Sequence, residues 1–525
     1  MTSVEPIPGG RAAVRRARQG GNGSRRRQRA RRWLRITAIT TGATLVAGCG
    51  AGYLYYQHLN GNIRSGTKNL TDEQGARTAP NAKGQTPLNI LMIGTDSRGS
   101  SENVALGGSA DEASRPGLAD VQMLLHVSAD RSNASMISIP RDTMVDIPAC
   151  RDEKGTKYPA VKHTAINEAL ARGGPGCVVG TWIGLTGLDI DHYMVVDFGG
   201  VVRMADAVGG VPVCVDRNMY DRYRPGHGGT GLKLPEGTTR VTGENALKWL
   251  RTRDAWGSDL GRTKAQHMYL SSMIRELKSG GRLTDPGQLM TLAEAATKSL
   301  TVDKPLADLK AIYDLGTDLR GVPTERTTTL TVPVVADPAN PTAKLLLKQT
   351  EVKQIWRMLL ADTPLDGKGA AAGQASAAPS PSPSPAASDG GAAPARSTIA
   401  VSVQNSSGTE GRAAEVRNAL TAAGFAKASL TGNGTARDTT RLTYGAGHRA
   451  EAQAVAAALN LPADALVESG TSRTLGLSIG RDWTAGTAFT PAAAPTALPK
   501  SVDAETSDND RSCMEVVPQG GLYTY

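Results

Sequence analysis

An uncharged segment near the N-terminus constrains the topology of the whole chain. Residues 36–60 contain no charged side chain, and this stretch is long enough to cross a bilayer as one helix. Its far end carries three tyrosines, which are typical of the membrane interface. Residues 1–35 hold eleven arginines and one acid, Glu5, an excess that equals the formal net charge of +10 of the whole chain. Because arginines before a span remain in the cytoplasm, we predict a single-pass anchor at 36–58 and an extracytoplasmic body.

Two other interpretations of this region stay open. Residues 31–35, RRWLR, resemble a twin-arginine export signal, and residues 46–49, VAGC, resemble a lipoprotein cleavage box that would lipidate Cys49. We favour the uncleaved anchor because apolar and aromatic residues continue beyond Cys49. The arginine-rich residues 1–35, which we expect to be disordered, could contact nucleic acid. Next to a span they instead set the topology, so we expect contact with the cytoplasmic membrane and no nucleic-acid partner.

Composition divides the rest of the 525-residue chain, which is long enough for several domains. A polar segment precedes the first apolar strand pattern, and an Ala/Pro/Ser-rich segment without core-forming residues separates two ordered regions. The predicted segments are a flexible stalk at 59–86, a main domain at 87–363, a linker at 364–397, a small domain at 398–483 and a disordered tail at 484–525.

Both ordered regions alternate between strand and helix patterns. In the main domain, apolar runs at 88–93, 123–127 and 135–139 predict buried strands, and helical patterns follow at 164–172 and 199–208. This alternation predicts an α/β or α+β domain with a central mixed sheet flanked by helices. The second region is predicted to be a small α/β domain. It lacks a catalytic constellation, so we predict a binding or scaffolding role for it.

Four of the five cysteines lie beyond the predicted span. They form no CxxC pair and no Cys/His cluster with zinc spacing, so metal binding through sulfur is not expected. An exported chain can form disulfides, and Cys150 and Cys177 flank a Pro-, Gly- and charge-rich segment. We therefore predict a Cys150–Cys177 disulfide, with other pairings left open.

The stretch 247–267, LKWLRTRDAWGSDLGRTKAQH, concentrates arginines around a short break between two helix patterns. Arg251 and Arg253 share a face if the chain leaves the first helix in an extended conformation. Arg262 and Gln266 lie on one side of the next helix. Guanidinium groups that converge on a loop make a good phosphate receptor, because each offers a planar, charged set of donors. The alternative is a solvated surface with ion pairs.

Carboxylates also stand at predicted strand ends. Asp96 and Asp120 lie at opposite ends of one long loop, whose length allows them to meet. Two carboxylates beside arginines suit Mg²⁺, and these groups together are what phosphoryl transfer requires. Taken singly, such residues are more often helix caps, turn residues or surface ion pairs. The full set is Asp96 with Arg98, Asp120, Arg141 with Asp142, Arg251 with Arg253, and Asp259 with Arg262 and Gln266.

Several common catalytic signatures are absent from the sequence. It contains no GxxxxGKS or GxxxxGKT phosphate loop, no GxSxG nucleophile elbow and no HExxH metal motif. The scattered histidines are therefore predicted to be structural or surface residues; they are His126, His163, His192 and His267.

Seven motifs occur in the order in which LytR-CpsA-Psr proteins carry them. They are NILMIGTDSRG, ADVQMLLHVSAD, SIPRDTMVDIP, INEALARGGPG, YMVVDFGGVVRMADAVGGVPV, LPEGTTRVTGENAL and LRTRDAWGSDLGRTKAQ. The chain resembles this family over about residues 87–280, with the pattern extending toward 360. The segment IAVSVQNSSGTEGRAAEVRNALTAAGF resembles the LytR C-terminal domain of actinobacterial members. A single anchor with an extracytoplasmic body is also typical of the family.

The resemblance implies a LytR-CpsA-Psr-type domain that acts as a Mg²⁺-dependent phosphotransferase. Such an enzyme moves a glycopolymer, teichoic-acid-like or another anionic or secondary wall polymer, from a polyprenyl-pyrophosphate carrier to a muramic acid hydroxyl. The implied partners are the polyprenyl-pyrophosphate-linked glycan, peptidoglycan and the cytoplasmic membrane.

The resemblance also assigns roles by motif position. Asp96 and Asp120 resemble the carboxylates that hold Mg²⁺. The residues that resemble pyrophosphate-binding positions are Arg98, Arg141, Arg251, Arg253, Arg262 and Gln266. The implied catalytic residues are Arg141, Arg251, Arg253, Asp259 and Arg262.

One motif departs from the family pattern. Leu118-Ala119-Asp120-Val121 stands where the family usually reads Arg-Ser-Asp-Thr or Arg-Ala-Asp-Thr, and Arg115 is the nearby substitute for the missing arginine. A specialised substrate or weakened activity is therefore one alternative to full activity. Two others are a pyrophosphatase acting on lipid carriers, with water replacing the sugar hydroxyl, and a non-catalytic, membrane-anchored wall-binding sensor or scaffold.

Overall fold

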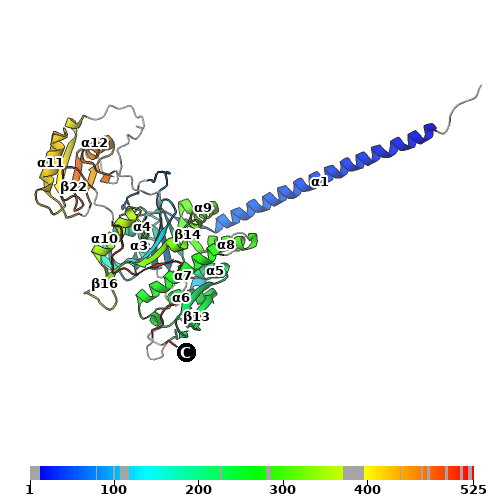
Figure 1. Ribbon diagram of the computed structural model, residues 1–525, viewed down its shortest axis with the longest axis horizontal. Helices are drawn as coiled ribbons and strands as arrows, with labels where there is room; N and C mark the ends of the chain where they lie inside the picture. Colours follow the sequence, from blue (N-terminus) through cyan, green and yellow to red (C-terminus); the bar gives the residue numbers. More distant parts are fainter. Residues whose placement is uncertain are drawn as a thin grey trace, which may run out of the picture.

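The computed structural model describes most of the chain. The described ranges are 12–78, 80–97, 101–106, 117–224, 228–279, 285–369, 395–437, 439–462, 465–469, 473–490, 495–508, 512–517 and 523–524, with side chains from Arg32 onward. Figure 1 shows a main domain, a smaller domain at one side and a long N-terminal helix that projects from the main domain.

A mixed eight-stranded sheet forms the centre of the main domain, which confirms the predicted fold class. The strand order is β1-β14-β9-β2-β3-β4-β15-β23. The pairs β1–β14, β2–β9 and β4–β15 are parallel and the other neighbours are antiparallel. The bounds are β1 Arg64–Gly66, β2 Leu88–Thr95, β3 Ala119–Val127, β4 Ala134–Ser138, β9 His192–Val196, β14 Leu300–Asp303, β15 Thr327–Thr331 and β23 Ala504–Thr506.

Helices cover both faces of this sheet, so neighbouring residues of a central strand enter different cores. On β2, Leu91 packs in a core with Trp182 of α4 and Trp356 of α10, whereas Ile90 packs with Leu315 of α9 on the other face. Burial on both faces explains the continuous apolar run at the start of the domain. The bounds are α3 Ala169–Gly173, α4 Pro175–Thr186, α8 Pro286–Ser299, α9 Leu309–Arg320 and α10 Gln349–Leu360.

A further core lies between α5, α6, α7 and the paired strands β10 and β13. Trp249 of α6 and Trp256 of the short helix η3 meet edge to face with ring centroids 5.0 Å apart. The Nε1 of Trp249 donates to the carbonyl of Ala265 on α7 at 2.9 Å. This core thus fixes the two helices that flank the break in the arginine-rich stretch. The bounds are α5 Phe198–Ala207, β10 Val211–Val215, β13 Gly237–Val241, α6 Gly243–Arg251, η3 Asp254–Trp256 and α7 Asp259–Ser279.

Short elements complete the main domain. A single short helix, α2 Ser101–Ala105, follows β2. Four two-stranded pairs are β5 Met144–Ile147 with β8 Val161–Ala165, β6 Cys150–Arg151 with β7 Lys157–Tyr158, β11 Met219–Tyr220 with β12 Lys233–Leu234, and β16 Val334–Ala336 with β17 Leu345–Leu347. The predicted Cys150–Cys177 disulfide is confirmed, with the two Cα atoms 5.8 Å apart.

Residues 59–86 pack against the main domain, so the prediction of a flexible stalk was wrong. β1 forms the edge strand beside β14, and Leu59 is only 3% exposed. Farther along, the backbone N–H of Ala76 donates to the carbonyl of Gly187 at 2.7 Å. A three-residue strand has no periodicity that a local pattern could reveal, and its partners lie far away in the sequence.

The polar tail also returns to the main domain, so its predicted disorder was wrong for the described residues. β23 pairs with β15 at the other edge of the sheet, and Cys513 forms a disulfide with Cys214 at a sequence separation of 299. Met514, Val516 and Tyr523 are buried in the core around α7. Figure 1 shows the red C-terminal segment ending beside α6 and β13, away from the smaller domain. Partners distant in the sequence, rather than the tail's own composition, order it.

The N-terminal helix α1, Ala12–Asn62, runs through the arginine-rich region. The structure therefore has a helix from Ala12 onward where the sequence predicted disorder, and the alanines, arginines and glutamines there favour helix. Its part Arg32–Asn62 is long and apolar enough to cross a membrane, and its most apolar window is not buried by the protein. Cys49 is a free, exposed cysteine on this helix.

The smaller domain is an α/β unit, as predicted. Its five-stranded sheet has the order β19-β18-β22-β20-β21. The bounds are β18 Ala400–Asn405, α11 Arg412–Ala422, β19 Lys427–Asn433, β20 Arg441–Tyr444, α12 Arg449–Leu459, β21 Leu466–Glu468 and β22 Leu475–Ile479. Phe489 joins its core, so the domain extends slightly beyond the predicted end at 483. Most of the predicted linker, residues 370–394, lies outside the described residues.

Candidate active site

A cavity of about 740 Å³ opens between one end of the central sheet and the helices α5, α6 and α7. It collects predicted site residues from four separate parts of the sequence. Those that line it are Asp96, Asp120, Arg141, Arg251, Arg253, Arg262 and Gln266. Asp259 stands behind the wall, and Arg98 lies outside the described residues.

The antiparallel pairing of β2 and β3 brings the two predicted carboxylates together. Thr95 at the end of β2 pairs with Ala119 at the start of β3, so Asp96 and Asp120 both lie at the same end of these two central strands. The Oδ1 of Asp96 accepts the backbone N–H of Leu118 at 2.8 Å. The residue that replaces the family's arginine therefore still holds Asp96, through its backbone.

Arg141 follows β4 and contacts Asp120. The side of the cavity formed by Asp96 and Asp120 is here called the first wall. Its Nη1 contacts Oδ1 of Asp120 at 2.9 Å, and its Nε lies 3.4 Å from Asp142 and 3.9 Å from Asp259. Burial works to lower the pKa of Arg141, but these carboxylates, Asp120 above all, outweigh it and raise the pKa. The Nε is buried and makes no hydrogen bond within the described part of the chain. The contacts with Asp120, Asp142 and Asp259 together hold the guanidinium of Arg141 in place.

The predicted break between two helices places Arg251 and Arg253 in the same cavity. α6 ends at Arg251, Thr252 leaves the helix with φ −57° and ψ 129°, and η3 begins at Asp254. Arg251 donates from Nη1 to the carbonyl of Leu106 at 3.0 Å and lies over the ring of Phe198. Arg253 is half-exposed and pairs with its neighbour Asp254 at 3.4 Å.

Arg262 and Gln266 project from the next helix, α7, four residues apart. Gln266 donates from Nε2 to the carbonyl of Leu250 at 3.2 Å, which ties α7 to the end of α6. Nη2 of Arg262 pairs with Oδ1 of Asp259 at 2.6 Å. Asp259 therefore holds an arginine of the wall and does not line the cavity itself.

The guanidinium group of Arg262 lies near those of Arg141 and Arg253. Burial lowers the pKa of Arg262, and the nearby charges of Arg141 and Arg253 lower it further, against the raising effects of Asp259 and Asp120. Cations held close together in a folded chain repel one another, and a bound anion would reduce that repulsion. The arginines at this wall form ion pairs, as one interpretation of the sequence expects, and they also line a cavity, as the phosphate-receptor interpretation requires.

Asp221 was not predicted as a site residue, and it supports the loop between Arg251 and Arg253. Its side chain is buried, and its Oδ2 accepts from the backbone N–H of Thr230 at 2.9 Å and from Oγ1 of Thr252 at 3.2 Å. Because Thr252 separates Arg251 from Arg253, this carboxylate fixes the backbone between them. Asp221 stands outside every motif quoted above, so the sequence carried no signal for it.

Apolar side chains also line the cavity, and the sequence did not single them out. The polar lining residues other than the predicted site residues are Thr95, Asp197, Asp221, Tyr223, Thr230, Glu244, Lys248 and Asp254. Phe198, at the N-terminus of α5, lies under Arg251 with 4.9 Å between the guanidinium carbon and the ring centroid. The other apolar lining residues are Ala105, Leu106, Val121, Val196, Val201, Leu247 and Leu250. One cavity thus combines cationic, acidic and apolar surfaces, which suits a ligand with a charged head and an apolar part.

The carboxylates are compatible with Mg²⁺ but do not form an all-protein metal site. No group of three or more His, Cys, Asp or Glu residues is arranged to hold a metal among the described residues. Asp96 and Asp120 each use Oδ1, so each keeps Oδ2 without a hydrogen bond or ion pair to the described chain. Mg²⁺ commonly binds one or two carboxylates together with phosphate oxygens and waters. The donor set fits that mode.

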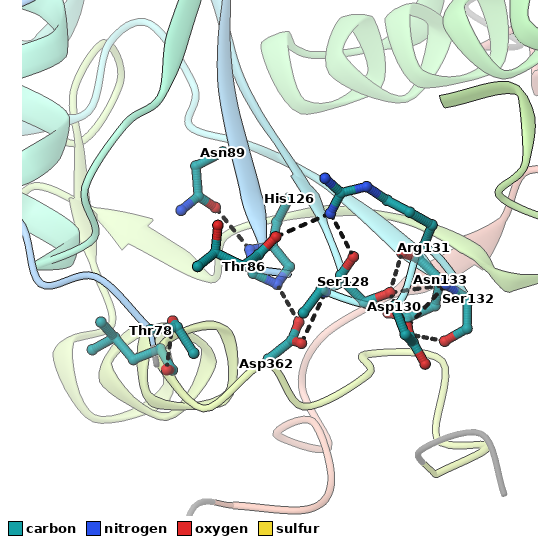
Figure 2. A network of polar contacts seen from close by, with 12 residues as sticks. Thr78, Thr86, Asn89, His126, Ser128, Asp130, Arg131, Ser132, Asn133 and Asp362 are labelled. Carbon is teal, nitrogen blue, oxygen red and sulfur yellow. Dashed lines mark hydrogen bonds and ion pairs between the residues drawn. The ribbon is translucent and has the colours of Figure 1, made fainter. Parts of the chain in front are cut away.

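The predicted structural histidines make contacts within the protein. Figure 2 shows His126, at the end of β3 opposite Asp120, between Asn89 and Asp362. Its ring nitrogens lie 2.7 Å from Oδ1 of Asn89 and 3.2 Å from Oδ1 of Asp362. This network joins the strands to the end of α10. The other contacts are His163 with Asp337, His192 with Asp303, and His267 with Ser138.

The fold is a mixed sheet with helices on both faces, and arginines, carboxylates and apolar side chains line a cavity at one end of its central strands. The LytR_cpsA_psr family model matches residues 53–360, and the chain belongs to the LytR-CpsA-Psr family. A second model, described as LytR cell envelope-related transcriptional attenuator, matches residues 398–483. The resemblances drawn from the sequence are therefore confirmed for both domains.

Curated relatives include proteins of the cell wall. Cell wall biosynthesis protein LcpA of Corynebacterium glutamicum is 30% identical over 314 residues, which cover 55% of this chain and 57% of LcpA. Probable cell wall biosynthesis protein LcpB of the same organism is 31% identical over 236 residues, or 45% of this chain and 52% of LcpB. The chain thus spans a little over half the length of both. The polyisoprenyl-teichoic acid–peptidoglycan teichoic acid transferase TagU of Bacillus anthracis is 25% identical over 275 residues, covering 52% of this chain and 80% of TagU.

Two solved structures are similar to part of this chain. A LytR-Csp2A-Psr enzyme from Actinomyces oris is 17% identical, with a TM-score of 0.42, and covers 56% of this chain and 96% of that structure. The structure titled TagT bound to LIIa-WTA is 20% identical, with a TM-score of 0.40, and covers 56% of this chain and 99% of that structure.

Proposed function

We propose that this protein transfers a glycopolymer from a polyprenyl-pyrophosphate carrier to a muramic acid hydroxyl of peptidoglycan, in a Mg²⁺-dependent reaction outside the cytoplasmic membrane. The polymer belongs to the anionic or secondary wall polymers. The convergence of four guanidinium groups, the carboxylates of Asp96 and Asp120, and apolar side chains on one cavity carries this proposal. The names of the relatives, as cell wall biosynthesis proteins and a teichoic acid transferase, support it.

The arginines would bind and orient the pyrophosphate. Arg141 and Arg262 are held by carboxylates behind or beside the cavity, so their guanidinium groups are in place before the substrate arrives. Arg253 is half-exposed and can turn toward a ligand. Donors fixed in advance stabilise the charge of the transition state without reorganisation. The apolar wall around Phe198 would receive the first units of the lipid chain.

The reaction itself is an in-line displacement at phosphorus. The sugar hydroxyl attacks the phosphorus nearest the polymer, the bond from that phosphorus to the bridging oxygen breaks, and lipid monophosphate leaves. Asp96 and Asp120 would hold Mg²⁺, which when bound neutralises phosphate oxygens. Arg251 and Arg253 would keep the leaving phosphate in line with the attacking hydroxyl.

The anchor helix would keep this cavity close to its lipid substrate. The last turns of α1 dock on the main domain, where the hydroxyl of Tyr56 donates to Asp308 at 2.8 Å. Oδ1 of Asn60 accepts the backbone N–H of Leu309 at 2.8 Å at the start of α9. A single-pass anchor that is bonded to the domain in this way restricts the domain to the membrane surface.

The proposal is tested with the full chain in nanodiscs, Mg²⁺, a polyprenyl-pyrophosphate glycan and peptidoglycan. We expect Arg253→Ala to lower turnover by about 10²–10³-fold, the usual cost of removing one transition-state donor. Arg240→Ala is the matched control, because Arg240 is equally exposed (46%, against 50% for Arg253) but pairs with Glu276 away from the cavity. Binding without turnover in the unmodified protein, or equal activity in both variants, would sink the proposal.

The same assay separates the alternatives. A pyrophosphatase would release lipid phosphate at the same rate without peptidoglycan and form no phosphodiester. A non-catalytic sensor or scaffold would bind peptidoglycan or lipid with no release at all. The half-exposed Arg253 beside the carboxylates Asp96 and Asp120 favours the transferase over the scaffold, because these groups together are what phosphoryl transfer requires.

A further inference from the structure

The C-terminal tail pairs with the central sheet through β23 and then continues to residues 252–257, the loop that carries Arg253 and is here called the arginine loop. Beyond β23, the disulfide between Cys513 and Cys214 fixes the tail to β10. The backbone N–H of Met514 then donates to the carbonyl of Cys214 at 2.9 Å, and that of Val516 to Oδ1 of Asp216 at 2.8 Å. These bonds place the tail next to the loop 252–257.

The tail contacts this loop directly through Val517. Its backbone N–H donates to the carbonyl of Ala255 at 3.0 Å. Its side chain lies against Gly257, where an added Cβ would be only 2.7 Å from Cγ2 of Val517. Gly257 has a φ of +75°, so neither the space nor the backbone there admits a larger residue. The loop that carries Arg253 is therefore shaped against the tail.

A second contact runs through side chains to Arg253 itself. Arg224 lies over the ring of Tyr523, with its guanidinium carbon 4.9 Å from the centroid, and donates to the tyrosine hydroxyl. Its Nη2 lies 3.8 Å from Oδ2 of Asp254, and Oδ1 of the same carboxylate pairs with Nε of Arg253 at 3.4 Å. Tyr523, Arg224, Asp254 and Arg253 thus form a continuous chain of contacts from the tail to the cavity.

We propose that the C-terminal tail is a positioning element of the active site, with Tyr523 as the positioning residue that orients Arg253 through Arg224 and Asp254. This inference rests on the proposed function, since it assigns the purpose of the contact to pyrophosphate binding. Arg253 is the most exposed of the arginines that carry ion pairs at the cavity, so its orientation depends most on a held partner. That partner is Asp254, and the tail holds it through Tyr523 and Arg224.

The primary test measures the dissociation constant of inorganic pyrophosphate with Mg²⁺ for the full chain. We expect Tyr523→Ala to weaken binding by about three- to tenfold, on the scale of one hydrogen bond, and Tyr523→Phe to recover part of it through the retained ring. Asp503→Ala is the control, because Asp503 belongs to the tail but pairs with Lys264 on α7 at 2.5 Å, away from the arginine loop. Equal weakening by Asp503→Ala, or none by Tyr523→Ala, would overturn the inference.

A double-mutant cycle excludes a merely structural effect. In an Arg253→Lys background, which keeps a cation but not the fork of donors, Tyr523→Ala should weaken pyrophosphate binding by less than about twofold. A full effect in that background would show that Tyr523 acts on folding rather than on Arg253, and would overturn the inference. If the unmodified chain binds no pyrophosphate, the proposed function fails as well. Binding that is unchanged by Tyr523→Ala removes the positioning role alone.

Discussion

Two regions of this molecule bury arginines in opposite ways. In the small domain, Arg412 donates from Nε to the carbonyl of Trp483 at 2.8 Å, contacts the carbonyl of Gly486, pairs with Glu415 and lies over the Trp483 ring. At the cavity, Arg262 pairs with Asp259 but faces the charges of Arg141 and Arg253, and its pKa is lowered by burial and by those neighbours.

The difference separates a structural arginine from a ligand-binding one. The chain itself provides acceptors around the whole guanidinium of Arg412, so that charge holds the domain together. At the cavity, cationic and acidic side chains line one open space, and the half-exposed side chain of Arg253 can still reach the phosphate oxygens of a ligand. Burial alone does not distinguish the two roles. The difference is that protein acceptors occupy all three guanidinium nitrogens of Arg412, whereas the arginines at the cavity line an open space.

The largest effect should come from Arg412→Ala. Removing this side chain leaves buried carbonyls without donors and opens space beside Trp483, so we expect the small domain to lose about 3–5 kcal/mol of its free energy of unfolding. Hydrogen exchange of residues 399–490 measures it, with the exposed Arg441→Ala as control. Turnover at the cavity should persist; if turnover falls with the domain, the two regions are not independent.

Arg253→Ala should show the reverse pattern. Because Arg253 is half-exposed and pairs only weakly with Asp254, chemical denaturation should give a free energy of unfolding within about 0.5 kcal/mol of the unmodified chain. Transition-state stabilisation should fall by about 3–4 kcal/mol. An unfolding change as large as the catalytic one would make Arg253 a structural residue like Arg412.

The pH dependence of the free energy of unfolding tests whether His267, which is buried, is a structural residue. Burial lowers the pKa of His267 to about 4, from 6.5, with a further lowering by Lys264, and Ser138 holds the ring at 2.9 Å. Between pH 6.5 and 4 the unfolded chain binds a proton that the folded chain rejects, so stability falls as the pH falls through this window.

The free energy of unfolding lost through this one group is on the order of 2–3 kcal/mol when the pH has fallen to about 4. His267→Gln removes the titration and keeps a polar side chain near Ser138. Its free energy of unfolding, measured by urea denaturation at several pH values, should fall less steeply than that of the unmodified chain. Identical slopes would contradict the assignment.

The smallest effect concerns the position where the family's arginine is missing. Leu118 binds Asp96 through its backbone, so Leu118→Arg keeps that bond and adds a cation near the first wall. We expect pyrophosphate to bind about three- to tenfold more tightly, as one added charge-assisted hydrogen bond would give. Calorimetric titration measures the dissociation constant, and Leu118→Met is the control. Weaker binding would show that the wall is already complete.

The sequence was most informative where a pattern is local. Uncharged length predicted the apolar helix, alternating elements predicted the mixed sheet, and the order of motifs predicted which residues meet at the cavity. The break between α6 and α7 was visible because two helix patterns flank it. The helix, strand and break signals lie within a few tens of residues, where periodicity and spacing are readable, whereas the motif order was informative because it resembles a known family.

The missed features depend on partners far away in the chain. β1 and β23 are three residues long and exist because an edge of the central sheet pairs with them. The Cys214–Cys513 disulfide has a sequence separation of 299, and a polar tail gives no local sign of it. Asp221 was missed for the same reason, since its role follows from where Thr252 lies.

The most direct test of the central claim is the melting temperature of the full chain with and without Mg²⁺-pyrophosphate. A ligand that binds only the folded state at about a hundredfold excess over its dissociation constant stabilises by about 2.7 kcal/mol. We predict a clear upward shift in the unmodified chain and in Arg240→Ala, and little or none in Arg253→Ala. No shift in the unmodified chain, or an equal shift in Arg253→Ala, would contradict the account of the arginine wall as a pyrophosphate receptor.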